Sequence, residues 1–321
     1  MQTDDKETRA FHGIDIGGSK IELVGFVERE EEENGELVEQ HRRRVNTPRD
    51  DFAAFEQAII SLVEEADAAL GRQAIVGLGL PGIIDPQSGR QISSNLPALN
   101  GRLVAQTLAE RLARPVFIGN DCQCFALSEA QGGAAHGMAS MFGAILGTGA
   151  GGGYCVRGHL VKGHNGIAGE WGHWGLPATL LHKHGLPVVD CPCGLRGCLE
   201  RYVSGTGMAM LHQHFHGEAL EAAAIEARAA AGDANAQHTL DLHLDLLANG
   251  LAMLVMAYDP HAIVLGGGLS KLPHLYQLLP AAMARHLFAG LRVPPVRAPR
   301  FGDAGGARGA ALLAKQLSRS S

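Results

Sequence analysis

Residues 11–26 read FHGIDIGGSKIELVGF, and residues 141–156 read MFGAILGTGAGGGYCV. Both stretches place apolar residues on either side of a short glycine-rich segment, a pattern that predicts two strands joined by a tight turn. The two copies lie about 130 residues apart, which we interpret as an internal duplication. The sequence therefore predicts an α/β protein of two related halves flanking a cleft, and we expect the glycine turns of both halves to face that cleft.

The remaining periodicity fits two α/β domains. We expect a small N-terminal domain of residues 1–120, completed by a C-terminal helix in 303–321, and a large domain of residues 121–302. The expected helices cover 51–70, 103–112, 122–131 and a long region over 217–258, and further expected strands cover 36–44, 74–80, 116–119 and 262–265.

Composition excludes several classes of function. The 321 residues are 46% hydrophobic and 19% charged, as is typical of a globular protein large enough for two domains. The net charge is −6 and no extended run of Lys or Arg occurs, so nucleic acid is not an expected partner. No apolar stretch reaches the roughly 18 to 20 residues of a membrane helix, and residues 1–10 do not resemble a signal peptide. We expect a cytoplasmic protein with no membrane partner.

The first glycine turn lies in the stretch DIGGSK at residues 15–20. Glycines let backbone N–H groups approach phosphate oxygens, and a carboxylate beside them can hold a hydrated magnesium ion. The spacing differs from that of a P-loop. Taken alone, a glycine turn between strands is common and requires no ligand. The candidate nucleotide-binding residues here are Asp15, Gly17, Gly18, Ser19 and Lys20.

Two further glycine turns follow predicted strands, over residues 147–153 and 266–268. Turns on two facing halves would clamp the β- and γ-phosphates of a nucleotide, with the hydroxyl of Thr148 as an additional donor. The third turn would leave room for a flat adenine ring against the backbone. Three such turns together favour a nucleotide site, with candidate residues Gly147, Thr148, Gly149, Gly151, Gly266, Gly267 and Gly268.

Asn120 and Asp121 lie between a predicted buried strand and a helix. Asp121 is well placed as the N-cap of that helix. It is equally well placed as a general base that takes the proton from an acceptor hydroxyl, while Asn120 orients the acceptor. The two roles are compatible, because a cap uses only one carboxylate oxygen.

The stretch CPCGLRGC at residues 191–198 places three cysteines within eight residues. Three thiolates and one imidazole make a closed tetrahedral zinc site, which is structural because no position stays open for water. The alternative is a metal-free cysteine-rich loop. His182 and His184 compete with His173 for the fourth position. The expected zinc ligands are His173, Cys191, Cys193 and Cys198.

A zinc ion in this loop would hold Glu170 and Glu200 beside the cleft as hydrogen-bond acceptors for sugar hydroxyls. A second group of histidines, His212, His214 and His216, recurs at every second residue in a partly helical region. Positions i and i+2 do not share a helix face, so a surface position is predicted for these histidines rather than a second metal site.

The motifs DIGGSK at 15–20, GTG at 147–149, EWGH at 170–173 and CPCGLRGCLE at 191–200 resemble those of the ROK family of sugar kinases and repressors. The resemblance runs from about Phe11 to Leu313. It implies an actin-like, ribonuclease-H-like duplicated fold, ATP with Mg²⁺, structural Zn²⁺, and phosphoryl transfer to a sugar 6-hydroxyl. It is also compatible with a homodimer.

The resemblance also implies roles for single residues. Asp121 corresponds to the catalytic base, and His173 would serve both the zinc ion and the sugar. Ser19 stands where the family more often has threonine, and it keeps the hydroxyl. The implied substrate-binding residues are Gly82, Asn95, Asn120, Asp121, Glu170, His173 and Glu200.

Within the family the chain most resembles bacterial N-acetylglucosamine kinases, on the stretches 95–98, 120–130 and 302–306. The expected activity is ATP-dependent phosphorylation of N-acetyl-D-glucosamine at its 6-hydroxyl. Fructokinase-like members share a segment like 198–207, so a fructokinase, glucokinase or mannokinase is the alternative. A sugar-responsive repressor is disfavoured, because about ten residues precede the first predicted strand and leave no DNA-binding domain.

Overall fold

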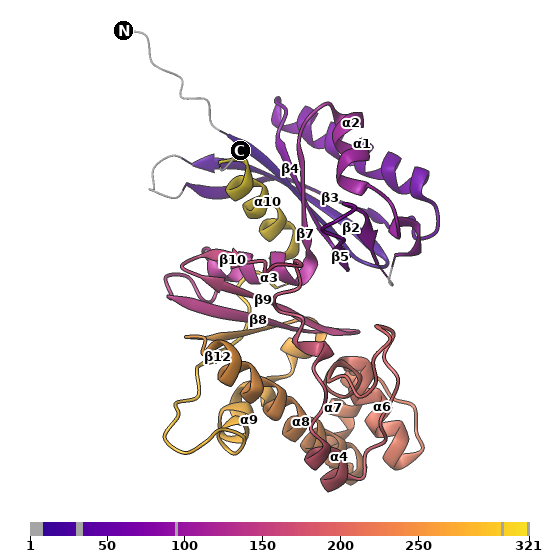
Figure 1. Cartoon of the computed structure of the whole chain (residues 1–321), viewed down its shortest axis with the longest axis vertical. Coiled ribbons are helices and arrows are strands. Elements are labelled where there is room, and N and C mark those ends of the chain that lie inside the picture. The colour runs from indigo at the N-terminus through magenta and orange to yellow at the C-terminus, as the bar shows by residue number, and fades with distance from the viewer. Residues whose placement is uncertain (1–8, 30–34, 94–95, 303–304, 320–321) are drawn as a thin grey trace. The chain divides into compact units, whose positions relative to one another are not determined.

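The chain forms two compact units. Unit 1 comprises residues 1–128, 163–167 and 304–321, and unit 2 comprises residues 129–162 and 168–303. Each unit has its own five-stranded sheet and its own hydrophobic core (Figure 1). The computed structural model describes residues 9–29, 35–93, 96–302 and 305–319.

The strands of the unit 1 sheet are β1 (Ala10–Ile16), β2 (Lys20–Arg29), β3 (Glu36–Asn46), β4 (Ile75–Leu80) and β7 (Val116–Asn120). Their order is β3-β2-β1-β4-β7. β1, β2 and β3 are antiparallel neighbours, whereas β4 is parallel to β1, and β7 is parallel to β4. The other elements are α1 (Phe52–Leu70), β5 (Ile83–Ile84), β6 (Gln91–Ile92), η1 (Pro97–Leu99), α2 (Val104–Leu112), α3 (Asp121–Ala130) and α10 (Gly305–Ser318).

Helix α1 forms where the sequence predicted it. Asp51 caps its first turn by accepting hydrogen bonds from two backbone N–H groups, and Gly71 ends it in the left-handed conformation with φ 66°. The buried residues of α1 recur at helical spacing and share one hydrophobic core with side chains of β1 and β4. These α1 residues include Phe55, Ile59, Leu62, Val63 and Ala66.

Helix α10 covers the opposite face of the unit 1 sheet from α1 and α2 (Figure 1). Its backbone lies directly on the strands, because a β-carbon at Gly13 would overlap the carbonyl of Ala307, and one at Gly77 would overlap the carbonyl of Ala310. These close approaches explain two glycines in strand interiors, where glycine otherwise weakens a strand.

Unit 1 extends to Ser128 rather than ending at residue 120 as expected, so most of α3 belongs to it. The reason is the contact between α3 and α10. A β-carbon at Gly309 would overlap the carbonyl of Cys124, and one at Gly305 would lie 3.4 Å from the ring of Phe125. Contacts this close place most of α3 in the same compact unit as α10.

The strands of the unit 2 sheet are β8 (Ser140–Leu146), β9 (Ala150–Val156), β10 (His159–Val161), β11 (Ile263–Gly266) and β12 (Val296–Arg297). Their order is β10-β9-β8-β11-β12. The other elements are η2 (Trp171–His173), α4 (Ala178–His184), α5 (Glu200–Val203), α6 (Gly205–His216), α7 (Ala222–Ala230), α8 (Ala234–Tyr258), η3 (Gly268–Lys271) and α9 (Pro273–Ala284).

The two sheets repeat one topology. In each, the first three strands form an antiparallel meander, and a later strand joins parallel to the first one. β1 and β2 of unit 1 thus correspond to β8 and β9 of unit 2, and each pair is joined by a glycine turn. The duplicated α/β fold expected from the sequence is confirmed.

The predicted long helical region over 217–258 is in fact two helices. α7 ends before Gly232, and Asp233 begins α8 by accepting hydrogen bonds from two backbone N–H groups. Among the described helices, α8 is the one long and apolar enough to cross a membrane by length and composition. Its most apolar window is 61% buried inside the protein, and it packs against α6, α7 and α9, as a core helix does.

The surface prediction for His212 is wrong. Its side chain is 1% exposed, and its Nδ1 lies 2.9 Å from the hydroxyl of Thr239 on α8. α6 packs against α8, which puts this position inside, whereas His214 is exposed as predicted.

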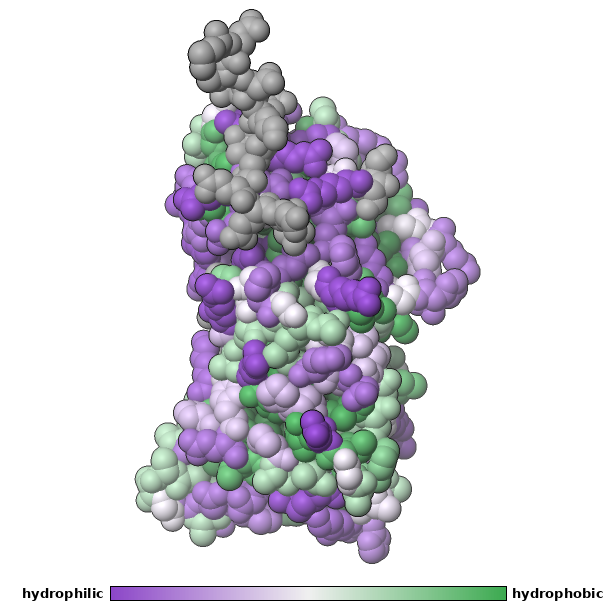
Figure 2. Space-filling model, turned by 90° about the vertical axis from the view of Figure 1, so that its left-hand side faces the viewer, coloured by the Kyte–Doolittle hydropathy of each residue, from purple (hydrophilic) through white to green (hydrophobic). Residues whose placement is uncertain are grey.

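Figure 2 shows that hydrophobic residues are more frequent on the viewed face of unit 2 than on that of unit 1. The exposed large hydrophobic residues of unit 2 include Val156, Val161, Met256 and Phe288.

Candidate active site

The unit 1 glycine turn joins β1 to β2. The Gly17 N–H donates to the Lys20 carbonyl at 2.9 Å, which closes the turn. A β-carbon at Gly18 would meet no atom within 4 Å, and residues 17–20 are all exposed. Packing within the protein therefore does not require glycine at position 18. A ligand that comes close to the backbone would require it.

Asp15 lies one residue before the end of β1, opposite Glu22 on β2 and Gly79 on β4. Its half-buried carboxylate faces the start of α10, because a β-carbon at Gly306 would lie 2.5 Å from its Cγ. The carboxylate thus stands beside the glycine turn and a helix N-terminus. That placement suits a carboxylate that holds a hydrated cation near phosphate oxygens.

The unit 2 turn is one residue shorter, because Leu146 pairs with Ala150 where Ile16 pairs with Ile21 in unit 1. Gly147 N–H donates to the Gly149 carbonyl at 2.9 Å, and a β-carbon at Gly147 would again meet no atom within 4 Å. Gly149 differs, because a β-carbon there would overlap the carboxylate of Glu200. Gly151 lies in β9, and its carbonyl accepts the Trp171 indole N–H at 2.8 Å. The turn itself therefore covers residues 147–149, not the whole run to 153.

The third glycine turn packs against the second. Gly267 has φ 75°, which favours glycine, and a β-carbon there would lie 2.5 Å from the Leu146 carbonyl and 2.9 Å from the Gly147 nitrogen. Gly266 ends β11, which is the parallel neighbour of β8. A β-carbon at Gly268 would meet no atom within 4 Å. Unit 2 thus brings two of the three predicted nucleotide-binding turns to one end of its sheet.

Asn120, and not Asp121, caps α3. The Asn120 Oδ1 accepts the Gln123 N–H at 3.2 Å, and its Nδ2 donates to the Gly82 carbonyl at 3.1 Å. Gly82 has φ 89° and follows β4, whose last residue pairs with Asn120 in the parallel register. The predicted substrate residues Gly82, Asn120 and Asp121 therefore meet at the carboxyl ends of β4 and β7, where open α/β sheets bind ligands.

Asp121 is the first residue of α3, and its Oδ1 accepts the N–H of Cys122 at 2.8 Å. Burial raises the pKa of Asp121, and the hydrogen bonds from Cys122 oppose this only in part. A carboxylate that is poorly solvated takes up a proton more readily. Asp121 therefore holds its proton more tightly than a solvated aspartate does, and its role as a general base stays a prediction.

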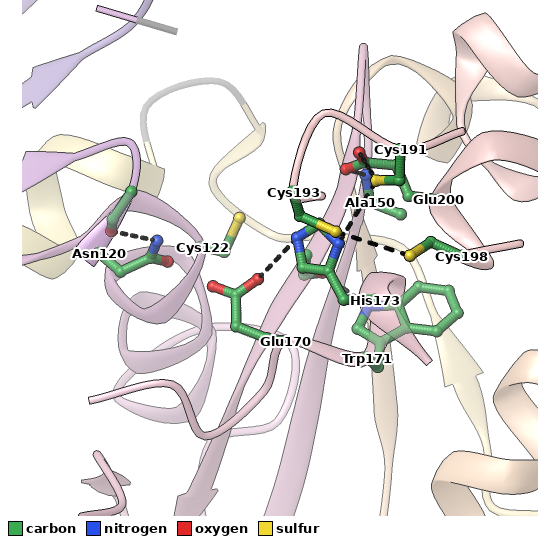
Figure 3. Close-up of polar contacts among 12 residues, drawn as sticks. Asn120, Cys122, Ala150, Glu170, Trp171, His173, Cys191, Cys193, Cys198 and Glu200 are labelled. Atoms are coloured by element: carbon green, nitrogen blue, oxygen red, sulfur yellow. Dashed lines mark hydrogen bonds and ion pairs between the residues drawn. The ribbon is translucent and has the colours of Figure 1, made fainter. Parts of the chain in front are cut away.

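Four side chains of unit 2 form a cluster whose ligand atoms all lie within 4.8 Å of one another (Figure 3). Cys193 Sγ and Cys198 Sγ are 3.7 Å apart, and Cys191 Sγ is 3.8 Å from His173 Nδ1. A tetrahedral zinc ion with Zn–S of about 2.3 Å and Zn–N of about 2.0–2.1 Å separates two sulfurs by about 3.8 Å and sulfur from nitrogen by about 3.5 Å. The cluster therefore fits such an ion.

His173 is the histidine of this cluster. Its Nδ1 faces Cys191, and its Nε2 lies 3.8 Å from Glu170 Oε2, so the two ring nitrogens face different groups (Figure 3). His184 is placed elsewhere, with its Nε2 2.8 Å from Asp245 Oδ2 on α8. Among the described residues, the four-residue cluster includes neither His184 nor His182.

The segment 170–173 is anchored by Trp171. Its indole is fully buried and donates to the Gly151 carbonyl of β9 at 2.8 Å. A β-carbon at Gly172 would overlap the Ala150 carbonyl, so η2 lies directly on β9. This anchoring holds the segment that carries Glu170 and His173, whose side chains face each other. The sequence identified the motif but did not reveal the contact with β9.

Glu200 links the cysteine cluster to the unit 2 glycine turn. Its Oε2 accepts the Ala150 N–H at 2.9 Å, directly after the turn, and its Oε1 lies 3.9 Å from Cys191 Sγ (Figure 3). Glu200 was predicted as a sugar contact. The structure shows in addition that one carboxylate oxygen holds the start of β9. The other oxygen remains on the side of the cluster.

The predicted residues fall into two groups. Unit 1 carries Asp15, the turn at 17–20, Gly82, Asn120 and Asp121, and unit 2 carries the turns at 147–149 and 266–268 together with Glu170, Glu200 and the Cys/His cluster. Asn95 lies outside the described residues.

The chain is similar over nearly its whole length to known sugar kinases. A sequence profile of the ROK family matches residues 11–317. An N-acetylgalactosamine kinase of Shewanella sp. (strain ANA-3) is 45% identical over 307 residues, which cover 96% of this chain and 97% of the relative. An N-acetyl-D-glucosamine kinase of Photobacterium profundum is 42% identical over 305 residues, which cover 94% of this chain and 98% of the relative.

Among solved structures, a ROK family glucokinase from Streptomyces griseus in complex with glucose and AMPPNP matches with a TM-score of 0.75 and 27% identity. The match covers 96% of this chain and 99% of that chain. These similarities confirm the expected actin-like, ribonuclease-H-like sugar kinase fold. The chain belongs to the ROK family.

Proposed function

We propose that the chain is an ATP-dependent kinase that transfers the γ-phosphoryl group of ATP to the 6-hydroxyl of N-acetyl-D-glucosamine. The observation that carries this proposal is the similarity, over nearly the whole chain, to relatives named as kinases of N-acetylated hexosamines. The site has the groups that such a reaction needs: glycine turns, a carboxylate beside one of them, and a poorly solvated aspartate.

The nucleotide part of the proposal rests on the three glycine turns. The turns at 17–19 and 147–149 would bind the phosphates through backbone N–H groups, and the turn at 266–268 would lie along the adenine. Asp15 would hold the hydrated Mg²⁺ that accompanies ATP. The Streptomyces griseus relative was solved with AMPPNP, an ATP analogue, which supports ATP as the phosphoryl donor.

Asp121 would accept the proton of the sugar 6-hydroxyl as that oxygen attacks the γ-phosphorus. Its raised pKa matches this task, because a better proton acceptor is needed than an ordinary solvated aspartate. Asn120 uses Oδ1 in the cap of α3, but a carbonyl oxygen accepts two hydrogen bonds, so a sugar hydroxyl can share it. Glu170, His173, Glu200, Gly82 and Asn95 complete the proposed sugar contacts.

The metal of the Cys/His cluster is proposed to be structural Zn²⁺, bound by His173 and the three cysteines. The donor set and the sulfur separations favour zinc, and four protein ligands leave no coordination position for water. The ion would fix the orientation of the His173 ring, whose Nε2 then stays available on the side of Glu170. The zinc ion has no chemical step of its own in this account.

N-Acetyl-D-galactosamine is the second candidate acceptor, because the Shewanella relative is a kinase of that sugar at 45% identity. The two sugars differ only in the configuration at C4. Glucose, mannose and fructose lack the N-acetyl group that the substrates of these two related kinases share, so they are less favoured acceptors.

A sugar panel tests the proposal. The purified protein is assayed with ATP and Mg²⁺ by coupled ADP release, with each of these five sugars as acceptor. We expect the highest kcat/KM with N-acetyl-D-glucosamine. A preference for N-acetyl-D-galactosamine would correct the acceptor, and a preference for a sugar without the N-acetyl group would contradict the proposal.

We further propose a cytoplasmic enzyme that assembles as a homodimer. The exposed apolar residues of unit 2, such as Phe288 at 67% exposure, are residues that such an interface would cover. Light scattering of the purified protein tests the homodimer, whose mass should be about twice the 33.8 kDa of a single chain. A mass equal to that of a single chain would contradict it.

A further inference from the structure

The β1–β2 turn and the β8–β9 turn each have a carbonyl that accepts a hydrogen bond from a threonine hydroxyl. In both cases the threonine lies far from the turn in the sequence. In unit 1 this residue is Thr47, which follows β3. Its hydroxyl donates to the Gly17 carbonyl at 2.8 Å, and its backbone N–H donates to the Ser19 carbonyl at 3.0 Å. Thr47 is buried, with 9% of its surface exposed. Two carbonyls of the first turn are therefore bonded to a single residue.

In unit 2 the corresponding residue is Thr206, the second residue of α6. Its hydroxyl donates to the Thr148 carbonyl at 2.7 Å, and the N–H of Gly205 donates to the Gly147 carbonyl at 2.8 Å. Two carbonyls of the second turn are thus bonded to the start of one helix.

The direction of the Thr206 proton follows from its neighbours. The Thr148 carbonyl can only accept, so the Thr206 hydroxyl must donate to it. Thr206 Oγ1 also lies 3.0 Å from Ser204 Oγ, so Ser204 donates its own proton to Thr206. Ser204 Oγ in turn accepts the Gly207 N–H at 3.0 Å, as the N-cap of α6. The hydroxyl of Thr206 is therefore fixed in its role as donor to the turn.

Holding a carbonyl also aims the next amide. In a trans peptide the C=O and the following N–H point in opposite directions. Drawing the Gly17 carbonyl toward Thr47 therefore directs the Gly18 N–H away from the threonine, and drawing the Thr148 carbonyl toward Thr206 directs the Gly149 N–H away in the same manner. The hydrogen bonds that close the two turns use the N–H groups of Gly17 and Gly147 instead, and the carboxylate of Glu200 lies beside Gly149.

We propose that Thr47 and Thr206 are a duplicated pair of positioning residues, which hold the two turns so that the N–H groups of Gly18 and Gly149 are presented to the phosphates of a bound nucleotide. The inference rests on the proposed function in its nucleotide part. It does not depend on which sugar is the acceptor. Amides that are already oriented need no reorganisation when an anion binds. Loss of the threonine hydrogen bond should therefore weaken anion binding more than it weakens the fold.

The test uses the full-length protein with Thr47→Val and Thr206→Val, which remove the hydroxyl and keep the shape, and with Thr47→Ser and Thr206→Ser as matched controls that keep it. Affinity for AMPPNP with Mg²⁺ and affinity for the sugar are measured separately by calorimetry. We expect each valine variant to bind the nucleotide roughly twofold to tenfold more weakly, as fits the loss of one neutral hydrogen bond, with unchanged sugar affinity. The serine variants should restore nucleotide binding.

Circular dichroism and melting curves of the variants separate positioning from folding. Thr206 is exposed, so its valine variant should fold normally and carry the test even if Thr47→Val unfolds. Nucleotide affinities within about twofold of the parent would overturn the inference, and so would equal losses for nucleotide and sugar, or no restoration by serine. A parent that binds AMPPNP but phosphorylates no sugar contradicts the proposed function alone. A parent that binds no nucleotide contradicts both.

Discussion

Replacing Asp121 by asparagine should remove the proton acceptor and leave its surroundings intact. The asparagine Oδ1 can still accept the Cys122 N–H that Asp121 accepts at 2.8 Å. The cap of α3 is made by Asn120 and does not change. General base catalysis contributes about 10²- to 10⁴-fold to a rate, so we expect kcat to fall by that factor, with KM for ATP and for the sugar nearly unchanged.

The same substitution should not destabilise the protein. Burial raises the pKa of Asp121 above that of a solvated aspartate, so the folded state holds the proton more tightly than the unfolded state does. The free energy of unfolding is therefore highest below the unfolded-state pKa of Asp121. It falls as the pH rises from that value through the higher folded-state pKa. Asparagine removes that penalty, and we expect Tm at neutral pH to be equal to or above that of the parent.

Steady-state kinetics and melting curves of Asp121→Asn, measured together, decide the matter. Asp51→Asn is the matched control, because Asp51 caps α1 and asparagine caps helices equally well, so activity and Tm should both stay at parent values. A fall in kcat of less than about tenfold, with a large rise in the sugar KM, would refute the reasoning. Asp121 would then bind the sugar without taking its proton.

Three further outcomes are expected. The pH dependence of kcat/KM of the parent should fall on the acid side with an apparent pKa above the ordinary aspartate value, since Asp121 must be ionised to act; a loss only below that value would contradict this. Gly18→Ala should keep the parent's Tm, because a β-carbon there meets no atom within 4 Å, but should raise KM for ATP; an unchanged KM would contradict phosphate binding at this turn. Cys198→Ser should lose the metal and melt at a lower temperature, as measured by elemental mass spectrometry and calorimetry, and parent protein with far less than one zinc per chain would rule out the site.

The glycine turns could be predicted because each is a local signal. A strand, a turn and a strand lie within sixteen residues of sequence, and the repeat of that pattern at 141–156 indicated the duplication. The cysteines at 191–198 gave the metal cluster for the same reason. In both cases residues that are close in the sequence carry the signal, although the fourth cluster residue, His173, lies 18 residues before Cys191.

Other features depend on contacts that the local sequence does not report. A single threonine such as Thr47 or Thr206 has no signature, because its partner carbonyl lies 30 or 58 residues away in the chain. The cap of α3 came from Asn120 because the helix begins one residue earlier than predicted. The burial of His212 depends on α8 packing against α6, and Asp233 begins a second helix within a region that was predicted as one.

The most direct test of the account is the identity of the product made from ATP and N-acetyl-D-glucosamine. Phosphorus–proton correlation NMR of the reaction mixture shows which sugar protons couple to the new phosphomonoester. We predict a single product whose phosphorus couples to the two protons on C6. Coupling to the anomeric proton, or no phosphorylated product from either N-acetylated hexosamine, would contradict the central claim.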